Sequence, residues 1–151
     1  MTGGIMDQKE ILKKNWIIDL IKDAGFGCMA SLEGDQPRVR PMMPHLTDNG
    51  ELLLAVLSRS RTINQIKENP RVEICYIDRK MYYCRITAIA KVSSNLDKKE
   101  IVWNNIPMLR QYFSGPNDPT YVLIEIDSNS IESMTPAQKA PDIHSFKLIT
   151  E

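Results

Sequence analysis

Short apolar runs separated by turn residues are the feature that most constrains the fold of this chain. The runs span residues 26–32, 38–43, 51–57, 71–78, 82–93, 120–127 and 130–136. Gly34 and Asp35 lie in a turn between the first two runs, and TDNG at residues 47–50 is a hairpin signal before the third. Because short strands joined by tight turns pair in opposite directions, the pattern predicts a mainly β, α+β protein built on a mostly antiparallel barrel.

Three segments have helical rather than strand-like patterns, and we expect them to pack outside the barrel. Residues 8–24 place apolar side chains near helical spacing. Ser60 is a candidate N-cap for a second helix, which Pro70 stops. Residues 95–113 predict one or two further short helices, broken at Pro107.

The length of 151 residues fits one domain with a sizeable core, so we expect a single domain over residues 1–151. Residues 1–7 and 137–151 fall outside the strand and helix patterns, and we expect them to be loose tails. The N-terminal residues lack an apolar signal core followed by a small-residue cleavage site. No run of about 20 apolar residues is present that could span a bilayer.

The chain has 19 basic and 19 acidic residues, so its formal net charge is zero. A neutral chain has no long-range attraction to nucleic acid or to an anionic membrane. The three cysteines lie in apolar runs and outside any CxxC motif, so we expect buried free thiols in a reducing cytoplasm. His45 and His144 lack ligand-type neighbours at short spacing, so we expect no metal site.

Two arginine clusters flank the run at residues 51–57, and together they suggest an anion site. Arg38 and Arg40 are two residues apart on a predicted strand and therefore share a face. Arg59 and Arg61 surround Ser60, where a strand meets a helix. Guanidinium groups, hydroxyls and the N–H groups of a helix N-terminus are donors that suit a phosphate.

A purely structural interpretation of the same arginines stays open. Arginines on a protein surface are commonly solvated or paired with neighbouring carboxylates. The acidic partners available nearby are Glu33, Asp35 and Asp48. Spacing alone does not choose between an anion site and ion pairs.

The order and spacing of four segments resemble a known family. The segments are RVRPM at residues 38–42, SRSRTINQIKENPRV at 58–72, RITAIAKV at 85–92 and WNNIPMLRQYFSGPNDPTYVLIEID at 103–127. Together they resemble the pyridoxamine 5'-phosphate oxidase-like split-barrel flavoproteins, and the small general-stress-protein branch in particular. The resemblance covers roughly residues 10–135.

The resemblance implies a six-stranded antiparallel split β-barrel with peripheral helices, a homodimer, and FMN bound at the subunit interface. It matches Arg40 to the arginine that reaches the FMN phosphate, and Ser60 with Arg61 to the pair that completes the phosphate site. The strand beside the isoalloxazine ring matches residues 41–45. The implied cofactor-binding residues are Arg40, Pro41, Met42, Met43, His45, Ala55, Val56, Ser60, Arg61 and Thr62, with Asn64 and Gln65 as secondary candidates in the matching helix.

This chain departs from the family pattern at several positions. Thr62 stands where the family has a basic residue, and Arg59 could supply that charge instead. His45 stands where the true oxidases place a lysine near the flavin ring, and Tyr83 matches a flavin-contacting glutamine. The C-terminal segment lacks the arginines with which those oxidases bind pyridoxal phosphate, so we expect no pyridoxamine phosphate oxidation.

We therefore expect an FMN-dependent oxidoreductase that acts on a small molecule of unidentified class, with no catalytic residue assigned. One alternative is a non-catalytic flavin carrier or sensor. Another is a barrel that binds a deazaflavin, haem or, against its neutral charge, single-stranded nucleic acid. His45 could serve as a proton donor at the flavin, although a satisfied residue at a strand end is the simpler interpretation.

Overall fold

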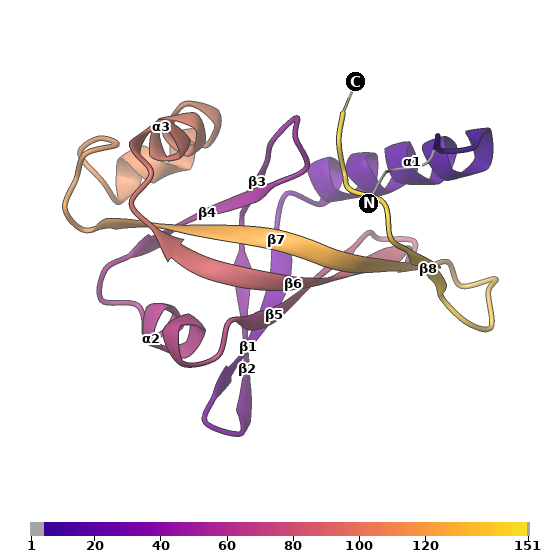
Figure 1. Cartoon of the computed structure of the whole chain (residues 1–151), viewed down its shortest axis with the longest axis horizontal. Helices are drawn as coiled ribbons and strands as arrows, with labels where there is room; N and C mark the ends of the chain where they lie inside the picture. Colours follow the sequence, from indigo (N-terminus) through magenta and orange to yellow (C-terminus); the bar gives the residue numbers. More distant parts are fainter. Residues whose placement is uncertain (1–4, 151) are drawn as a thin grey trace.

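A computed structural model describes residues 5–150, and its strands form one sheet (Figure 1). Six strands in this part of the chain have six or more residues. They are β1 (Gly27–Glu33), β2 (Gln36–Met42), β4 (Leu52–Leu57), β5 (Arg71–Ile77), β6 (Tyr83–Ser93) and β7 (Tyr121–Met134). Two shorter strands, β3 (His45–Leu46) and β8 (Asp142–His144), complete the sheet.

The strand order confirms the antiparallel split-barrel prediction. The order is β2-β1-β5-β6-β7-β4-β3, with β8 paired to β7, and each of these pairings is antiparallel. The sheet does not close by hydrogen bonds, yet its two edge strands, β2 and β3, are separated in the chain only by Met43 and Pro44. Pro37 and Pro41 lie on the edge strand β2, where a missing N–H costs least.

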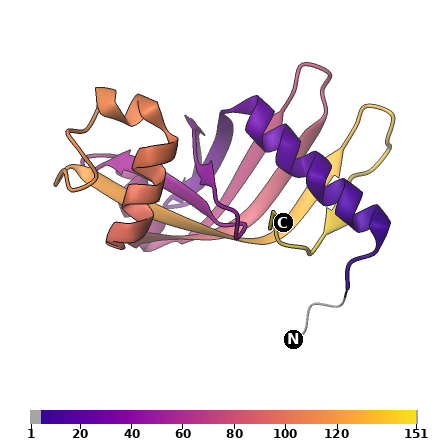
Figure 2. The same cartoon turned by 90° about the horizontal axis from the view of Figure 1, so that it is seen from above.

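The helices lie where the sequence predicts them. They are α1 (Gln8–Ala24), α2 (Arg61–Glu68) and α3 (Leu96–Asn105), followed by the 3₁₀ helix η1 (Pro107–Gln111). Asp7 caps α1 by accepting a hydrogen bond from the Glu10 N–H at 2.8 Å. Figure 2 shows α1 crossing one face of the sheet, with α3 and η1 at the opposite end of the molecule.

Two apolar cores hold these layers together. The main core joins α1 and α2 to the concave face of the sheet, and it includes Ile17, Ile21, Ile66, Met29, Ile74, Ile86 and Ile131. The second core lies where α3 and η1 cover the other face of β4 and β7, and it includes Leu53, Val102, Ile106, Phe113 and Leu123. Alternate residues of β4 and β7 therefore belong to different cores, as the period-2 geometry of a strand requires.

Two predictions about the C-terminal third are wrong. Residues 120–127 and 130–136 form one strand, β7, which pairs with β6 on both sides of a bulge at Asn129. The extra residue of a bulge interrupts the alternation of buried positions, so the sequence shows two runs. The segment after Ala137 is also not loose throughout, because β8 pairs with β7 and Leu148 is fully buried in the main core.

The cysteines differ in exposure, against the prediction that all three are buried. Cys84 is fully buried, Cys75 is half-buried and Cys28 is exposed, since Cys28 lies on the outward face of β1. Between residues 5 and 150, no helix is long and apolar enough to cross a membrane. The same residues contain no group of three or more His, Cys, Asp or Glu side chains that could hold a metal ion. Of the predicted loose N-terminal tail, residues 1–4 lie outside the described residues.

Candidate functional site

Glu33 is the centre of a charged network between the β1–β2 hairpin and the first turns of α2. Its carboxylate accepts hydrogen bonds from Arg38 Nη2 at 3.1 Å and from Gln65 Nε2 at 3.0 Å. Arg61 Nη1 lies 3.7 Å from the second carboxylate oxygen. The hydrogen bonds from Gln65 and Arg38, helped by the charge of Arg61, lower the pKa of Glu33 despite its partial desolvation. Glu33 is therefore ionised at neutral pH.

Gln65 connects Arg40 to this network. Arg40 donates from Nη2 to Gln65 Oε1 at 2.5 Å and from Nη1 to the Met29 carbonyl at 3.2 Å. Gln65 is 3% exposed, so its amide has a fixed orientation. Burial, followed by repulsion from Arg61, lowers the pKa of Arg40. The two guanidinium groups of Arg40 and Arg61 therefore lie close enough to repel each other electrostatically.

The N-terminus of α2 adds donors beside Arg61. Ser60 is the N-cap, as predicted, and its Oγ accepts a hydrogen bond from the Thr62 N–H at 3.2 Å. The Ser60 hydroxyl proton remains available to donate, because a capping hydroxyl uses only its oxygen as acceptor. Thr62 is buried, whereas the Arg59 and Arg61 side chains are exposed.

We refer to Arg38, Arg40, Arg61, Glu33 and Gln65 as the arginine cluster. Its three guanidinium groups and one carboxylate give a formal charge of 3 − 1 = +2. The predicted ion pairs with Glu33 do form at Arg38 and Arg61. A positive excess nevertheless remains at a helix N-terminus, where the helix dipole adds to it. The arrangement is therefore suited to bind an anion with two negative charges.

The residues expected beside a flavin ring alternate between the two faces of the sheet. Met42 packs against the main core, while Met43 and Ala55 pack against the second core. Val56 is buried within the main core, so its side chain faces the barrel interior. Pro41 is exposed on β2. Met43 and Ala55 are thus the half-buried apolar side chains of this set that lie on the second-core side of the sheet, away from the barrel interior.

His45 lies at the other end of the same stretch, in β3. It lines a pocket of about 450 Å³ together with Met43, Asp48 and residues of α1 and α3. Burial lowers the pKa of His45, with Lys22 acting in the same direction and Asp48 opposing it. The imidazole is therefore neutral at pH 7 and can either donate or accept a hydrogen bond.

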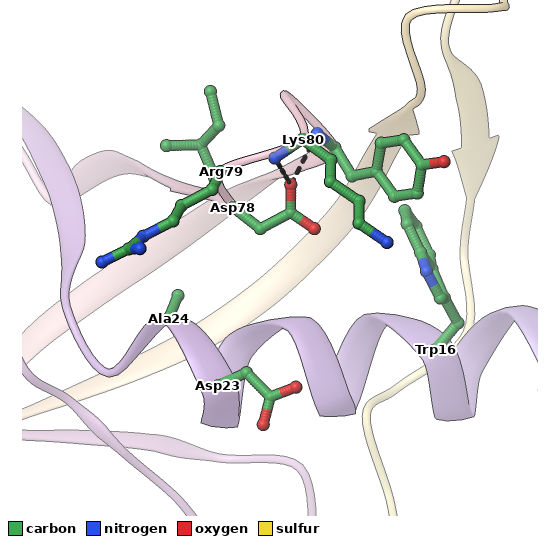
Figure 3. Close-up of a pocket in the computed structure, with 8 residues that line it drawn as sticks. Trp16, Asp23, Ala24, Asp78, Arg79 and Lys80 are labelled. Atoms are coloured by element: carbon green, nitrogen blue, oxygen red, sulfur yellow. Dashed lines mark hydrogen bonds between the residues drawn. The ribbon is translucent and has the colours of Figure 1, made fainter.

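A separate pocket of about 810 Å³ lies between α1 and the β5–β6 turn. Figure 3 shows Trp16 and Ala24 of α1 facing this turn, in which Asp78 accepts hydrogen bonds from the Lys80 and Tyr82 N–H groups at 2.8 and 3.0 Å. The Trp16 and Tyr82 rings are 6.2 Å apart. None of the five residues of the arginine cluster lines this pocket, so it is distinct from the anion site.

Comparison with known proteins decides the family. The model of the family described as pyridoxamine 5'-phosphate oxidase like matches residues 13–139. The chain belongs to the pyridoxamine 5'-phosphate oxidase-like family. General stress protein 26 of Bacillus subtilis (strain 168) is 24% identical over 140 residues, which cover 90% of this chain and 96% of that protein. The resemblance noted from the four sequence segments is thereby confirmed.

Solved structures agree with this membership. The crystal structure of General Stress Protein 26 from Bacillus anthracis has a TM-score of 0.76 and 25% identity, covering 89% of this chain and 98% of that one. An FMN binding protein from Nostoc punctiforme has a TM-score of 0.67 at 15% identity and covers 93% of this chain and 91% of that one. A heme binding protein from Mycobacterium smegmatis has a TM-score of 0.68 at 11% identity, covering 83% and 55%. The last two show a shared fold.

Within the pyridoxamine 5'-phosphate oxidase-like fold, the structure adds a residue that sequence reasoning missed. Ser31 is buried and donates to Gln65 Oε1 at 2.6 Å, so it helps to hold the amide that contacts Arg40. Gln65, a secondary candidate from the sequence, hydrogen-bonds three side chains, those of Glu33, Arg40 and Ser31. A signal was present, because Arg61 and Gln65 are four residues apart and share one face of α2.

Proposed function

We propose that this protein binds FMN and that the arginine cluster holds the FMN phosphate. The observation that carries the proposal is the excess of two positive charges on Arg38, Arg40, Arg61 and Glu33 at the N-terminus of α2. Guanidinium groups and a helix N-terminus are the donors that phosphate recognition uses most. The family membership and the FMN binding protein among the neighbours with the same fold support the choice of flavin.

The donor set present in this chain fits a phosphate dianion. Arg40 and Arg61 would supply charge-assisted hydrogen bonds, and Ser60 would donate its hydroxyl proton. The charge missing at Thr62 is offset in part by the exposed Arg59 nearby. Glu33 opposes the anion electrostatically and would also keep Arg38 and Arg61 oriented when no anion is present.

The apolar residues that follow Arg40 are suited to an isoalloxazine ring. Met43 and Ala55 are half-buried against the second core and face outward. The backbone of residues 41–45 leads from the arginine cluster to the His45 pocket. His45 is neutral at pH 7 and would exchange a proton or a hydrogen bond at that end of the site.

We infer an oxidoreductase, because a bound flavin would supply hydride and electron transfer while the chain binds and orients it. Its substrate is a small molecule and is not expected to be pyridoxamine 5'-phosphate. That expectation rests on the resemblance, because the C-terminal segment lacks the arginines with which the true oxidases bind pyridoxal phosphate. Lys147 pairs with Asp127 at 3.0 Å, and Leu148 fills the main core. A non-catalytic flavin carrier would show binding without turnover.

We propose a homodimer, which would complete the flavin site from a second copy. Three exposed hydrophobic side chains at the helices that cover the second core support it. Leu96 and Ile101 of α3 are 62% and 40% exposed, and Tyr112, which follows η1, is 56% exposed. Burying such side chains against a partner is favourable, by about 25 cal/mol per Å² of apolar surface. Light scattering should give twice the chain mass, and a monomer that still binds FMN would contradict the dimer.

The experiment that tests the cofactor is a comparison of FMN with riboflavin by flavin fluorescence titration. The two ligands share the ring system and differ in the phosphate. We expect FMN to bind at least tenfold more tightly, because charge-assisted hydrogen bonds contribute about 1.5–3 kcal/mol each. Equal affinities would remove the phosphate assignment, and binding of neither would remove the flavin.

Haem is the second candidate, and His45 is the observation that favours it. A neutral imidazole that lines a pocket of about 450 Å³ is a suitable axial ligand. The heme binding protein with the same fold gives the precedent. An absorbance spectrum of the purified protein separates the candidates, since bound flavin gives a yellow preparation and bound haem a red one.

A further inference from the structure

Cys28, Cys75, Arg85 and Glu132 form a row across four adjacent strands, away from the arginine cluster. Cys28 of β1 is directly opposite Cys75 of β5, which is opposite Arg85 of β6, which is opposite Glu132 of β7. Directly opposed residues of antiparallel strands point to the same face of a sheet. All four side chains therefore share the outward face. Cys84 is fully buried and points to the other face.

The two thiols are close enough to react with each other. Opposed residues in an antiparallel pair have Cβ atoms about 4.5–5.5 Å apart, and a disulfide needs about 3.5–4.5 Å. An approach of about 1 Å or less therefore closes the bond without a change of strand register. A bond closed in this way holds some strain and is readily reduced again. Both cysteines are free thiols in this structure.

The two thiols differ in access to solvent, and the pKa of Cys75 is raised. Cys28 is exposed, whereas Cys75 is half-buried between β1 and β6. Burial raises the pKa of the Cys75 thiol, while the charge of Arg85 lowers it and Cys28 raises it. An oxidant in solution therefore meets Cys28 first, and Cys75 is held as a thiol beside it.

Arg85 is placed to assist the reaction of Cys75. Its Nη2 pairs with Glu132, and its Nε is buried without a hydrogen-bond partner among the described residues. A buried donor without an acceptor is unusual in a folded protein. A thiolate on Cys75 would lie on the same face, one strand away, and would be stabilised by this guanidinium group.

We propose that Cys28 and Cys75 form a reversible dithiol–disulfide site for small peroxides, with Arg85 as a positioning residue. The Cys28 thiolate attacks hydrogen peroxide, the O–O bond breaks, and a sulfenic acid and hydroxide form. The Cys75 sulfur then attacks the sulfenic sulfur, the S–S bond forms, and the hydroxyl leaves as water with the thiol proton. Two thiols lose two electrons and two protons, and one peroxide becomes two waters.

The test is limiting hydrogen peroxide added to the reduced, purified chain, followed by intact mass and peptide mapping. We expect the mass of the chain to fall by about 2 Da, the mass of two hydrogens, with Cys28 linked to Cys75 and Cys84 still free. Dithiothreitol should reverse the change. Cys84→Ser should behave like the parent protein, and Cys28→Ser should not lose the two hydrogens.

The role of Arg85 is tested by the rate of disulfide formation. Arg85→Gln should slow it about two- to fivefold, the size expected when one partly exposed charge is lost, and Arg85→Lys should restore most of the rate. Arg71→Gln is the matched control, since Arg71 is on the same strand and face as Cys75 but four residues away, about 13 Å. It should leave the rate unchanged.

Three results would overturn the proposal. They are a disulfide that involves Cys84, a disulfide between two copies of the chain, and oxidation that stops at one added oxygen on Cys28. A second measurement on the unmodified reduced protein needs no variant to fold. A trivalent phenylarsenical, which bridges neighbouring thiols, should bind one per chain and protect Cys28 and Cys75 together. Failure to bind would also contradict the pair. The peroxide and phenylarsenical experiments do not depend on flavin binding.

Discussion

Two charged clusters join helices to the sheet, and they have opposite compositions. In the arginine cluster, three guanidinium groups share one carboxylate, Glu33. At the other cluster, Lys98 of α3 lies between two carboxylates, 2.8 Å from Glu51 and 2.6 Å from Glu125. The formal charges are 3 − 1 = +2 and 1 − 2 = −1. We refer to the second as the lysine cluster.

The difference indicates which cluster is built for a ligand. Lys98 is satisfied by both acidic partners, and their hydrogen bonds raise its pKa. This cluster ties α3 to β4 and β7 and needs nothing further. The arginine cluster keeps positive charge in excess although one of its guanidinium groups, Arg40, is half-buried. Uncompensated charge of this kind is costly for folding alone and is favourable when an anion binds.

The largest expected effect comes from removing a guanidinium group. Arg40→Ala or Arg61→Ala should raise the dissociation constant for FMN about ten- to a hundredfold, since each charge-assisted hydrogen bond contributes about 1.5–3 kcal/mol. The double variant should cost more than either single one but less than the sum, because both groups bind one phosphate. Fluorescence titration measures all three.

Arg79→Ala is the control for these variants. Arg79 lines the pocket between α1 and the β5–β6 turn, apart from the arginine cluster, so its loss should change affinity little. If Arg40 instead serves folding alone, Arg40→Ala should lower the thermal stability of the flavin-free protein while FMN affinity barely moves. Both quantities should therefore be measured on the same variant.

Lys98→Ala should change the stability of the fold rather than the affinity for FMN. Its loss leaves Glu51 and Glu125 facing each other without a cation, and we expect a destabilisation of about 0.5–1 kcal/mol, discounted for partial exposure. A chain of this size should then melt about 1–4 °C lower. FMN affinity should stay the same. A variant that lost FMN affinity at unchanged stability would break the distinction between the two clusters.

How far the sequence predicts these regions depends on whether the contacts are local. The α2 N-cap at Ser60 and the edge position of β2 follow from local residue chemistry, and both are observed. The role of Gln65 depends on how the β1–β2 hairpin, about 30 residues earlier, packs against α2. Tertiary pairing likewise places β8, because its three residues have no strand pattern of their own.

Glu33→Gln tests the single carboxylate of the arginine cluster, and it should change FMN affinity less than the loss of Arg40 or Arg61. The carboxylate reduces the positive excess of the arginine cluster, so its removal should tighten FMN binding about two- to fivefold. The amide can still accept hydrogen bonds from Arg38 and Arg61, which preserves their orientation. Riboflavin affinity is the internal control and should not change. Weaker FMN binding in this variant would mean that orientation by Glu33 matters more than repulsion.

The smallest expected effect is on the acid sensitivity of the lysine cluster. Burial raises the pKa of Glu125, but hydrogen bonds and charge from Lys98 outweigh it, so the pKa lies below 4.5, its ordinary value. A carboxylate whose pKa is lowered by folding stabilises the fold above its unfolded value, and this contribution is lost as the pH falls further. Stability should therefore decline below about pH 4.5. Glu125→Gln should flatten this decline, because the group no longer takes up a proton on unfolding. Melting temperatures between pH 3 and pH 6 test it, with Asp127→Asn as a control on the same strand. An unchanged slope in Glu125→Gln would show that Lys98 relies on Glu51 alone.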